Sequence, residues 1–338
     1  MLHLNASILE LKTRHPFIIA RGSRDTYRTV LVQLIDEDGA EGWGEAAPQR
    51  YYGETAETVL AALQVYATVL PANPAHLEDA EAALELALKG NNSARAALST
   101  ALHDLAGKRL GVPVHRMFGL DAGKCPLSTF TIGIDTPERI QMKVREAEQY
   151  PVLKVKLGTD DDMAILRAIR DVTDKEVRVD ANCGWTRKQA LAMLPVLTEF
   201  GVTVLEQPLE PGDLDGLGLV TSQARIPVIA DESCLVAADI PALVGKVDGI
   251  NIKLAKTGGL REALRMISVA RAHHLMVMVG CMIESSIGIT AAAQFCPLVD
   301  ICDLDGAALL AHDPYVGATI ERGRLRLPEG PGLGLSVR

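Results

Sequence analysis

The chain has 338 residues with 43 acidic and 34 basic side chains, a net charge of −9 and a hydrophobic content of 48%. This length predicts about two domains, or one barrel with an appendage, and a charged fraction of 23% argues against intrinsic disorder. The acidic balance and the lack of a basic stripe argue against a nucleic-acid partner. The longest apolar run, Leu275 to Ile283, is far shorter than the roughly 18 residues of a membrane span, so we expect no membrane partner.

The start of the chain and the cysteines favour a cytoplasmic protein. The first residues, MLHLNASILELKTRHPF, show no basic stretch followed by an apolar run and so do not resemble a signal peptide. The six cysteines are scattered without a CxxC pair: Cys125, Cys183, Cys234, Cys281, Cys296 and Cys302. This spacing favours neither a zinc ribbon nor a disulfide scaffold, and we expect buried, reduced thiols.

Residues 1–122 are expected to form an α+β capping domain. Alternating residues predict two strands, over 4–12 and 28–36, then a turn at Asp38-Gly39 and a short strand near Gly42-Trp43-Gly44. Three helices are predicted to follow, over 56–66, 77–88 and 93–108. We expect the C-terminal segment, about 312–338, to pack back on this domain.

Residues 123–311 are expected to form a barrel. Eight short runs rich in β-branched residues alternate with helical sequence, over 127–132, 152–157, 177–180, 202–206, 228–231, 249–253, 276–280 and 299–304. Charged residues at the ends of five of them are separated by 24, 26, 25 and 22 residues, as one strand, two loops and a helix require. The fold class we expect is α/β, a modified TIM-type (β/α) barrel with an N-terminal α+β capping domain. Its chemistry would lie at the C-terminal strand ends.

Lysines occupy two of these runs. With a side-chain period of two, Lys154 and Lys156 leave the same face of a strand, and that face points into the barrel. Repulsion between the two ammonium groups, with burial, is expected to lower a lysine pKa toward the range of a general base. Two hydrated lysines on an exposed strand are the alternative, and the apolar flanks argue against it. Lys253 would face this pair across the barrel, and Lys256 is expected to be structural.

Three consecutive runs end in a carboxylate, at Asp180, Glu206 and Asp231. Each alone could be a helix cap or a loop salt bridge. Three of them at one barrel mouth would repel one another unless a cation neutralised them, and oxygen ligands with open positions suit Mg²⁺. Zinc fits less well because no histidine or cysteine accompanies them. We therefore expect one Mg²⁺ per chain.

The motifs KVKLG, VDANCGW, LEQPL, ADES and NIKLAKTGG together resemble the enolase superfamily, in its muconate-lactonizing-enzyme subgroup. The resemblance covers nearly the whole chain. It implies that the three carboxylates bind Mg²⁺ and that the metal holds a substrate carboxylate. It also implies that Lys156 and Lys253 act as acid and base on opposite faces of the α-carbon, through an enediolate, while Lys154 tunes Lys156 and touches the carboxylate.

The last barrel run ends in Cys302-Asp303-Leu304-Asp305-Gly306. Asp303 and Asp305 share one face at a spacing of two, and since the metal ligands are already assigned, a substrate ammonium fits them. This DxDG motif resembles that of dipeptide epimerases, in which the two aspartates hold the free N-terminal amine of the substrate. The alternative is that one of them caps a helix or pairs with an internal lysine.

Capping-domain loops are expected to contact the rest of the substrate. The run from Ala20 to Arg24, ARGSR, resembles a loop of L-Ala-D/L-Glu epimerases, which implies that Arg24 meets the side chain of the second residue. A surface salt bridge of Arg24 with Asp25 or Glu54 is the alternative. Further substrate contacts are expected from four residues: Tyr52, Thr131, Cys281 and Met282. Glu284 either repels an acidic substrate or points away.

The resemblance therefore predicts an isomerase, a dipeptide epimerase that inverts the α-carbon of the C-terminal residue by two-base 1,1-proton transfer. L-Ala-D/L-Glu and a role in peptidoglycan recycling are the expectation, with a homo-oligomeric assembly. N-acyl amino acid racemase, o-succinylbenzoate synthase, and epimerases of hydrophobic or other dipeptides are alternatives in the same subgroup. A scaffold without turnover is the alternative of another class, and the five expected charged positions argue against it.

Overall fold

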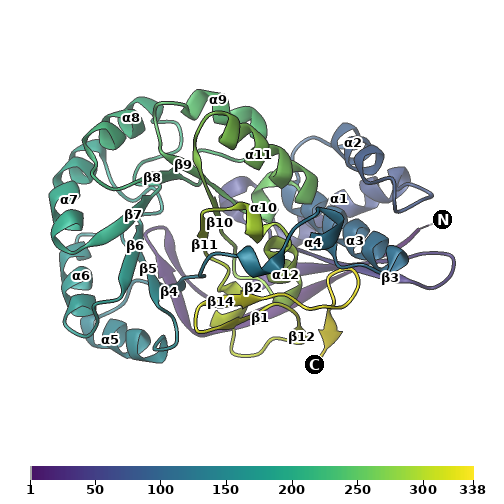
Figure 1. Cartoon of the computed structure of the whole chain (residues 1–338), viewed down its shortest axis with the longest axis horizontal. Helices are drawn as coiled ribbons and strands as arrows, with labels where there is room; N and C mark the ends of the chain where they lie inside the picture. The colour runs from purple at the N-terminus through teal and green to yellow at the C-terminus, as the bar shows by residue number, and fades with distance from the viewer. Residues whose placement is uncertain (1) are drawn as a thin grey trace.

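The N-terminal part of the chain forms an antiparallel sheet with helices on one face (Figure 1). The computed structural model describes residues 2–338. Its first sheet has the order β1 (His3–Ile19), β2 (Gly22–Ile35) and β3 (Glu41–Ala46). Three helices follow, α1 (Ala56–Tyr66), α2 (Leu77–Ala87) and α3 (Asn92–Leu110). The alternating side chains of Val30, Val32 and Leu34 on β2 are buried in this α+β core, so the predicted period of two holds.

Helix α3 is buried almost all round because it packs on both the sheet and the barrel. Every residue from Ser93 to Gly107 except Arg95 is buried, and such a helix needs no polar stripe. On the barrel side, Ser99 Oγ accepts a hydrogen bond from Leu260 N at 3.0 Å, and Asn92 Nδ2 donates to Lys256 O at 2.5 Å. Helix α3 therefore fixes the N-terminal sheet relative to the barrel.

Eight parallel strands form the second sheet, in which neighbours along the chain are neighbours in space. They are β4 (Phe130–Ile132), β5 (Val152–Lys156), β6 (Glu176–Asp180), β7 (Val202–Glu206), β8 (Val228–Ala230), β9 (Gly249–Ile252), β10 (Met276–Val279) and β11 (Ile301–Cys302). A parallel bridge between Ser128 and Cys302 joins the two ends of the curled sheet. The expected fold class, a TIM-type barrel with an N-terminal α+β cap, is confirmed.

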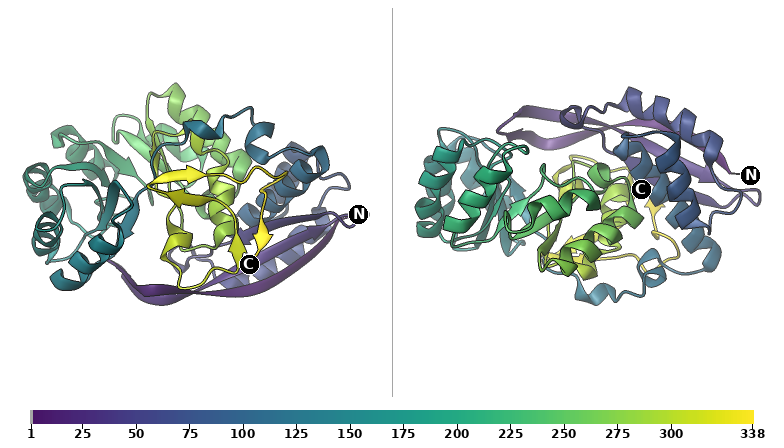
Figure 2. Two further views of the ribbon diagram at one scale, coloured as in Figure 1. Left: turned by 60° about the horizontal axis from the view of Figure 1, so that its bottom comes forward. Right: turned by 90° about the horizontal axis from the view of Figure 1, so that it is seen from above.

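Helices cover the outside of the barrel between successive strands, as Figures 1 and 2 show. They are α5 (Pro137–Glu146), α6 (Asp162–Arg170), α7 (Arg187–Glu199), α8 (Leu214–Gln223), α9 (Ile240–Leu243), α10 (Leu254–Thr257), α11 (Leu260–Ala272) and α12 (Ser286–Ala293). Another short helix, α4 (Val114–Met117), precedes the barrel. The last strand is followed only by a 3-10 helix, η6 (Gly306–Leu309), so no α-helix follows β11 in the part of the chain that the structure describes.

The C-terminal segment returns to the N-terminal part of the chain. It contains two small antiparallel pairs, β12 (Tyr315–Val316) with β15 (Ser336–Val337), and β13 (Thr319–Glu321) with β14 (Arg324–Arg326). Leu333 N donates to Asp104 Oδ1 of α3 at 2.7 Å, and Gly332 bridges to Pro113. The C-terminal residues thus contact the expected capping domain, whose exact boundaries remain a prediction.

The register of the barrel strands brings the charged strand ends together. Lys156 is paired with Asp180, and Asp180 with Glu206. Glu206 is paired in turn with Ile229, two positions before Asp231. Since in-register residues of parallel strands present their side chains to the same face, four charged groups follow one another around the barrel interior.

The first two strands are longer than predicted and form one extended hairpin. Residues 13–16 of β1 lie opposite the single residue Asp25 of β2, so the register shifts between Lys12 and Phe17. Pro16 has no N–H to donate to the ladder, and the alternation that predicts a strand stops before it. As a result Arg24, expected in a loop, lies on β2.

The cysteines and the helix lengths bear on two expectations from the sequence. All six cysteines are free, with Cys125 and Cys281 half-buried and the others buried, in agreement with the expected reduced thiols. Among residues 2–338, no helix has the length and apolar character that crossing a bilayer requires.

The contact between β3 and α3 predicts a large effect of one methyl group. A Cβ at Gly44 would overlap the carbonyl oxygen of Ala97, and neither backbone can move freely. We expect Gly44→Ala to lower the free energy of unfolding by about 1–3 kcal/mol, as overpacking does, measured by urea denaturation. Gly212→Ala is the control, because its Cβ meets open space. Equal stability of the two variants would contradict this account of the contact.

Candidate active site

Three buried carboxylates form the centre of the site. Asp180 and Glu206 are the last residues of β6 and β7, and Asp231 directly follows β8. Their exposed fractions are 0%, 1% and 0%, and one oxygen of each lies within 4.8 Å of the others. The apolar strands before them fix the backbone, so the carboxylates are held at the carboxyl ends of neighbouring strands, where barrel enzymes carry their chemistry.

Three buried lysines surround this cluster. Lys156 Nζ lies 2.6 Å from Asp180 Oδ2, and Lys253 Nζ lies 2.6 Å from Asp231 Oδ2. Lys156 and Lys253 thus flank the carboxylates at the first and last of the three strand ends. Lys154 lies deeper, with Nζ 2.7 Å from Glu206 Oε2 and 3.3 Å from Asp180 Oδ2. The predicted inward face of the Lys154–Lys156 strand is therefore correct.

Lysine–lysine repulsion does not decide the pKa of Lys154, the lysine expected to tune its neighbour. Burial alone would lower its pKa, but the carboxylates of Asp303, Glu206 and Asp180 raise it well above the ordinary value. Burial also lowers the pKa of Lys253, but the charges of Asp231, Glu206 and Glu232 together raise it above the ordinary value. The sequence argument considered only the lysine pair, whereas the fold surrounds Lys154 with acids from three other strand ends.

The donor set fits a divalent cation. Carboxylates as close as these repel one another, and burial penalises each charge further. Burial and the charge of Asp180 raise the pKa of Glu206, although the charge of Lys154 lowers it. The surrounding lysines therefore do not fully compensate the negative charge of the cluster. Two buried acceptors nearby, Asn182 Oδ1 and Glu232 Oε2, have no hydrogen-bond partner among residues 2–338. The three carboxylates offer only oxygen atoms as ligands, and Mg²⁺ prefers oxygen ligands.

Two residues that hold the ligands were not singled out for that role by sequence reasoning. Asn251 Nδ2 donates to Glu206 Oε1 at 2.7 Å. Lys256 is buried, donates to Asp231 O at 2.6 Å and pairs with Asp231 Oδ1. Lys256 thus has the structural role expected for it, and it fills this role by holding a carboxylate of the site. The sequence signal that could have identified Asn251 is its place as a polar residue inside an apolar strand, in the run INIKLAK.

The two aspartates of the DxDG motif lie on the opposite wall. Asp303 Oδ2 accepts from Lys154 Nζ at 2.8 Å, and its other oxygen accepts from Thr129 Oγ1. The internal lysine pair considered above as an alternative is therefore present for Asp303. Asp305 Oδ2 accepts from Thr131 N at 2.6 Å, and Asp305 makes no ion pair among residues 2–338. Burial and the charge of Asp303 raise the pKa of Asp305, which a cationic partner would reverse.

A cavity of about 480 Å³ lies above these groups. Its lining brings together ten of the predicted residues: Arg24, Tyr52, Thr131, Lys154, Lys156, Lys253, Cys281, Met282, Asp303 and Asp305. Arg24 forms no ion pair within residues 2–338, so the alternative bridges to Asp25 and Glu54 are not present. Arg50, which sequence reasoning did not select, lines the same cavity and is likewise unpaired in the described chain.

Arg21, which sequence reasoning did not select, connects the tip of the β1–β2 hairpin to the barrel. Arg21 Nη1 lies 2.7 Å from Glu232 Oε1 and donates to Asn182 O at 2.8 Å. Its guanidinium carbon lies 4.3 Å from the ring centroid of Tyr51, within the range of a cation–π contact. These contacts hold the hairpin that carries Arg24 over the barrel mouth.

Glu284 does not line this cavity. Its Oε1 accepts from Met282 N at 2.8 Å, and burial together with Glu45 raises its pKa to about 8. Of the two outcomes considered above for Glu284, the structure thus favours a side chain turned away from the substrate. The raised pKa means that it carries little charge near neutral pH.

Family profiles match both parts of the chain. Residues 4–119 match the mandelate racemase/muconate lactonizing enzyme N-terminal domain, and residues 138–338 match the enolase C-terminal domain-like family.

Individual relatives are similar over nearly the whole chain. An L-Ala-D/L-Glu epimerase of Bacteroides thetaiotaomicron is 44% identical, covering 96% of this chain and 85% of its own. An L-Ala-D/L-amino acid epimerase of Maribacter sp. is 40% identical over 99% of each chain. The crystal structure of a dipeptide epimerase from Cytophaga hutchinsonii, complexed with Mg and D-Ala-L-Val, has a TM-score of 0.94 at 28% identity, covering 99% and 95% of the two chains.

The carboxylate cluster predicts a measurable cation affinity. We expect Glu206→Gln to weaken Mg²⁺ binding at least about tenfold, because it removes one anionic ligand from a set of three. Isothermal titration of the metal-free protein with MgCl₂ measures this. The control is Glu176→Gln, at the exposed start of β6, which should bind as the unmodified protein does. Unchanged affinity in Glu206→Gln would place the cation elsewhere.

Proposed function

The chain belongs to the mandelate racemase/muconate lactonizing enzyme family of the enolase superfamily and is an isomerase, and on that premise we propose that it is a Mg²⁺-dependent dipeptide epimerase. It would invert the α-carbon of the C-terminal residue. The observation that carries the proposal is the position of Lys156 and Lys253 on either side of the carboxylate cluster, in one cavity with an acidic pair. Proton removal and return on opposite faces of one carbon requires this arrangement.

The chain's own groups divide the work of a 1,1-proton transfer. Asp180, Glu206 and Asp231 would hold Mg²⁺, whose charge stabilises the substrate carboxylate where negative charge develops. One lysine, with Nζ unprotonated, takes the proton from Cα and becomes an ammonium. The other, with Nζ protonated, returns a proton to the opposite face, so the enediolate lasts only between the two steps. Lys154 would place a further positive charge beside the same carboxylate.

The amine of the substrate would lie between Asp303 and Asp305. Asp305 is buried, has no ionic partner among the described residues and has a raised pKa. An ammonium group supplies the missing positive charge and can donate to both carboxylates. N-acyl amino acids and succinylbenzoate precursors have no such group, which disfavours the other activities of the subgroup.

The second side chain of the dipeptide would meet Arg24 and Arg50. Two unpaired cations in one cavity favour an acidic side chain, and we propose L-Ala-D/L-Glu as the substrate. Ile19 and Ile283 also line the cavity, and they favour a dipeptide with an apolar second residue as the second candidate. A cytoplasmic location is part of the proposal, supported by the six free cysteines. The expected homo-oligomer stays a prediction.

The two-base mechanism predicts that loss of either lysine abolishes most of the epimerisation but leaves α-proton exchange from one substrate configuration. Lys156→Ala and Lys253→Ala should each lower epimerisation by roughly 10²–10⁴-fold, because each removes one acid–base group. In deuterated water, each variant should still exchange the α-proton of one configuration only, and the two variants should differ in which. Mass spectrometry of recovered dipeptide measures this.

Lys188→Ala on the exposed surface of α7 serves as the matched control and should behave as the unmodified enzyme. Epimerisation at the rate of the unmodified enzyme in either Lys156→Ala or Lys253→Ala would exclude the two-base assignment.

The specificity proposal can be tested at Arg24, one of the two unpaired arginines of the cavity. Arg24→Met keeps the length of the side chain but removes its charge, so it should raise KM for L-Ala-L-Glu about tenfold, the effect of one charge-assisted hydrogen bond. KM for L-Ala-L-Leu should not rise. Arg28→Met is the control, since Arg28 on the same strand pairs with Glu57 at 2.5 Å. Equal losses for both dipeptides would show that Arg24 does not read the side chain.

A further inference from the structure

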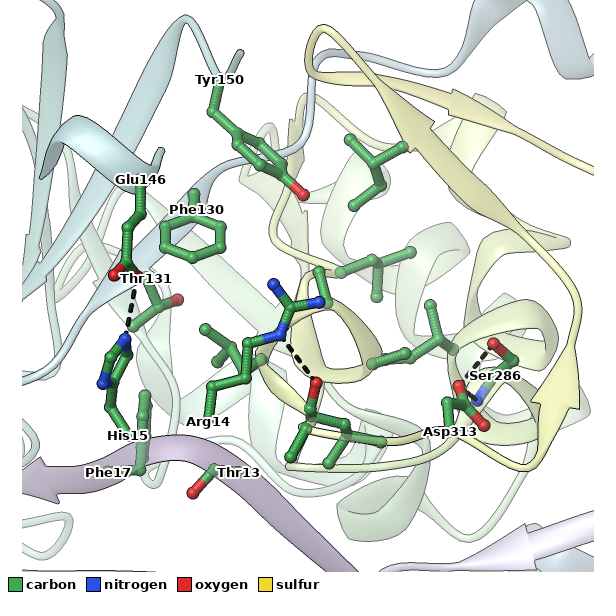
Figure 3. A pocket seen from close by; sticks show the side chains of 18 of the residues that line it. Thr13, Arg14, His15, Phe17, Phe130, Thr131, Glu146, Tyr150, Ser286 and Asp313 are labelled. Atoms are coloured by element: carbon green, nitrogen blue, oxygen red, sulfur yellow. Dashed lines mark hydrogen bonds and ion pairs between the residues drawn. The ribbon is translucent and has the colours of Figure 1, made fainter. Parts of the chain in front are cut away.

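A second cavity lies on the outer wall of the barrel, where an eighth barrel helix would otherwise pack. It measures about 380 Å³, within the size range of small-molecule sites. Its walls come from β1, from β4 and α5, from α12, and from the segment after β11. The hollow lies between Glu146 of α5 and Ser286 of α12, which line it from opposite sides (Figure 3).

Tyr150 is the group in this cavity that most requires a partner. The residue is only 4% exposed, and its hydroxyl points into the hollow (Figure 3). Within residues 2–338 its hydroxyl forms no hydrogen bond. Its ring is held by Phe130, with ring centroids 4.8 Å apart. A ligand acceptor at this point would give the hydroxyl the partner that residues 2–338 do not supply, and the hydrogen bond would contribute to binding.

Arg14 points toward Tyr150 from the other side of the hollow (Figure 3). Its Nε donates to Leu310 O at 3.0 Å, and its terminal nitrogens have no partner in the described chain. Among the neighbouring charged groups, His15 pairs with Glu146 at 2.8 Å, and Asp313 accepts from Ser286. Arg338 also lines the cavity and forms no ion pair within residues 2–338. Arg14 is therefore a cation free to bind an anion, and its planar fork suits a carboxylate.

The rest of the lining is mixed, and its larger apolar members are Phe17, Ile289, Leu304 and Leu309. Thus one guanidinium and one phenol face the same hollow, and apolar side chains line another part of it. We propose that this cavity is a second binding site, for a small molecule that combines one carboxylate with an apolar body. The carboxylate lies between Arg14 and Tyr150, and the apolar body lies against Ile289 and Leu304.

The site adjoins the substrate cavity. Phe17, Thr131 and Leu309 line both hollows, and Thr131 N also donates to Asp305 Oδ2. A molecule bound on the outer side therefore contacts the wall that positions an acidic group of the substrate cavity. Occupancy of the outer site is expected to change the apparent affinity for substrate.

The probe for this site is 3-phenylpropionate, titrated by calorimetry into the Mg²⁺-loaded full-length protein. We expect saturable millimolar binding that Arg14→Met weakens at least tenfold and Tyr150→Phe about threefold to tenfold, with 3-phenylpropanamide binding more weakly than the acid. Arg24→Met is the matched control in the substrate cavity and should leave probe affinity unchanged. The comparison of Arg14→Met with Arg24→Met does not require the dipeptide activity to be correct.

Three results would overturn the proposal. The first is probe affinity that falls in Arg24→Met but not in Arg14→Met, which would place the probe in the substrate cavity. The second is the absence of saturable binding in the millimolar range. The third is equal affinity for acid and amide, which would show that the cavity does not recognise the carboxylate. Tyr150→Phe retains the ring and its packing, so its result does not depend on a disturbed fold.

Discussion

The mutual repulsion of three buried carboxylates is the constraint on which the rest of the site depends. Asp180, Glu206 and Asp231 lie within 4.8 Å of one another, in a setting where each charge is deprived of water. Such a group persists only if positive charge surrounds it. The fold provides Lys154, Lys156, Lys253 and Lys256 at hydrogen-bonding distance, and the oxygen atoms that remain suit a divalent cation.

This electrostatic arrangement also explains how one set of residues can serve stability and chemistry. Two of the lysines that neutralise the carboxylates, Lys156 and Lys253, are also the ones proposed to exchange protons with a substrate. The pKa of Lys253 depends on how much negative charge the cluster retains, because the carboxylate of Asp231 beside it raises this pKa. Any cation or substrate that alters the charge of the cluster therefore alters the proton affinity of its neighbours.

Sequence reasoning predicted most of the fold and much of the site, because both depend on local patterns. Period-two runs with charged ends indicated the barrel strands, and α1 (Ala56–Tyr66) matches its predicted range. It ended β1 early because Pro16 interrupts the alternation. It overlooked Arg21, Asn251 and Arg50, whose partners lie on distant segments or whose environment depends on the hairpin. It considered only the repulsion between Lys154 and Lys156, since the acids around Lys154 come from strands remote in the chain.

The return of the C-terminal residues to α3 has a consequence for folding. The buried carboxylate of Asp104 accepts the amide of Leu333, and the two residues are separated by 229 positions in the chain. A contact between residues so far apart requires closure of the whole loop between them, which costs conformational entropy and slows its formation. One of the buried hydrogen bonds of α3 therefore depends on a segment that can reach this helix only when the intervening barrel is in place.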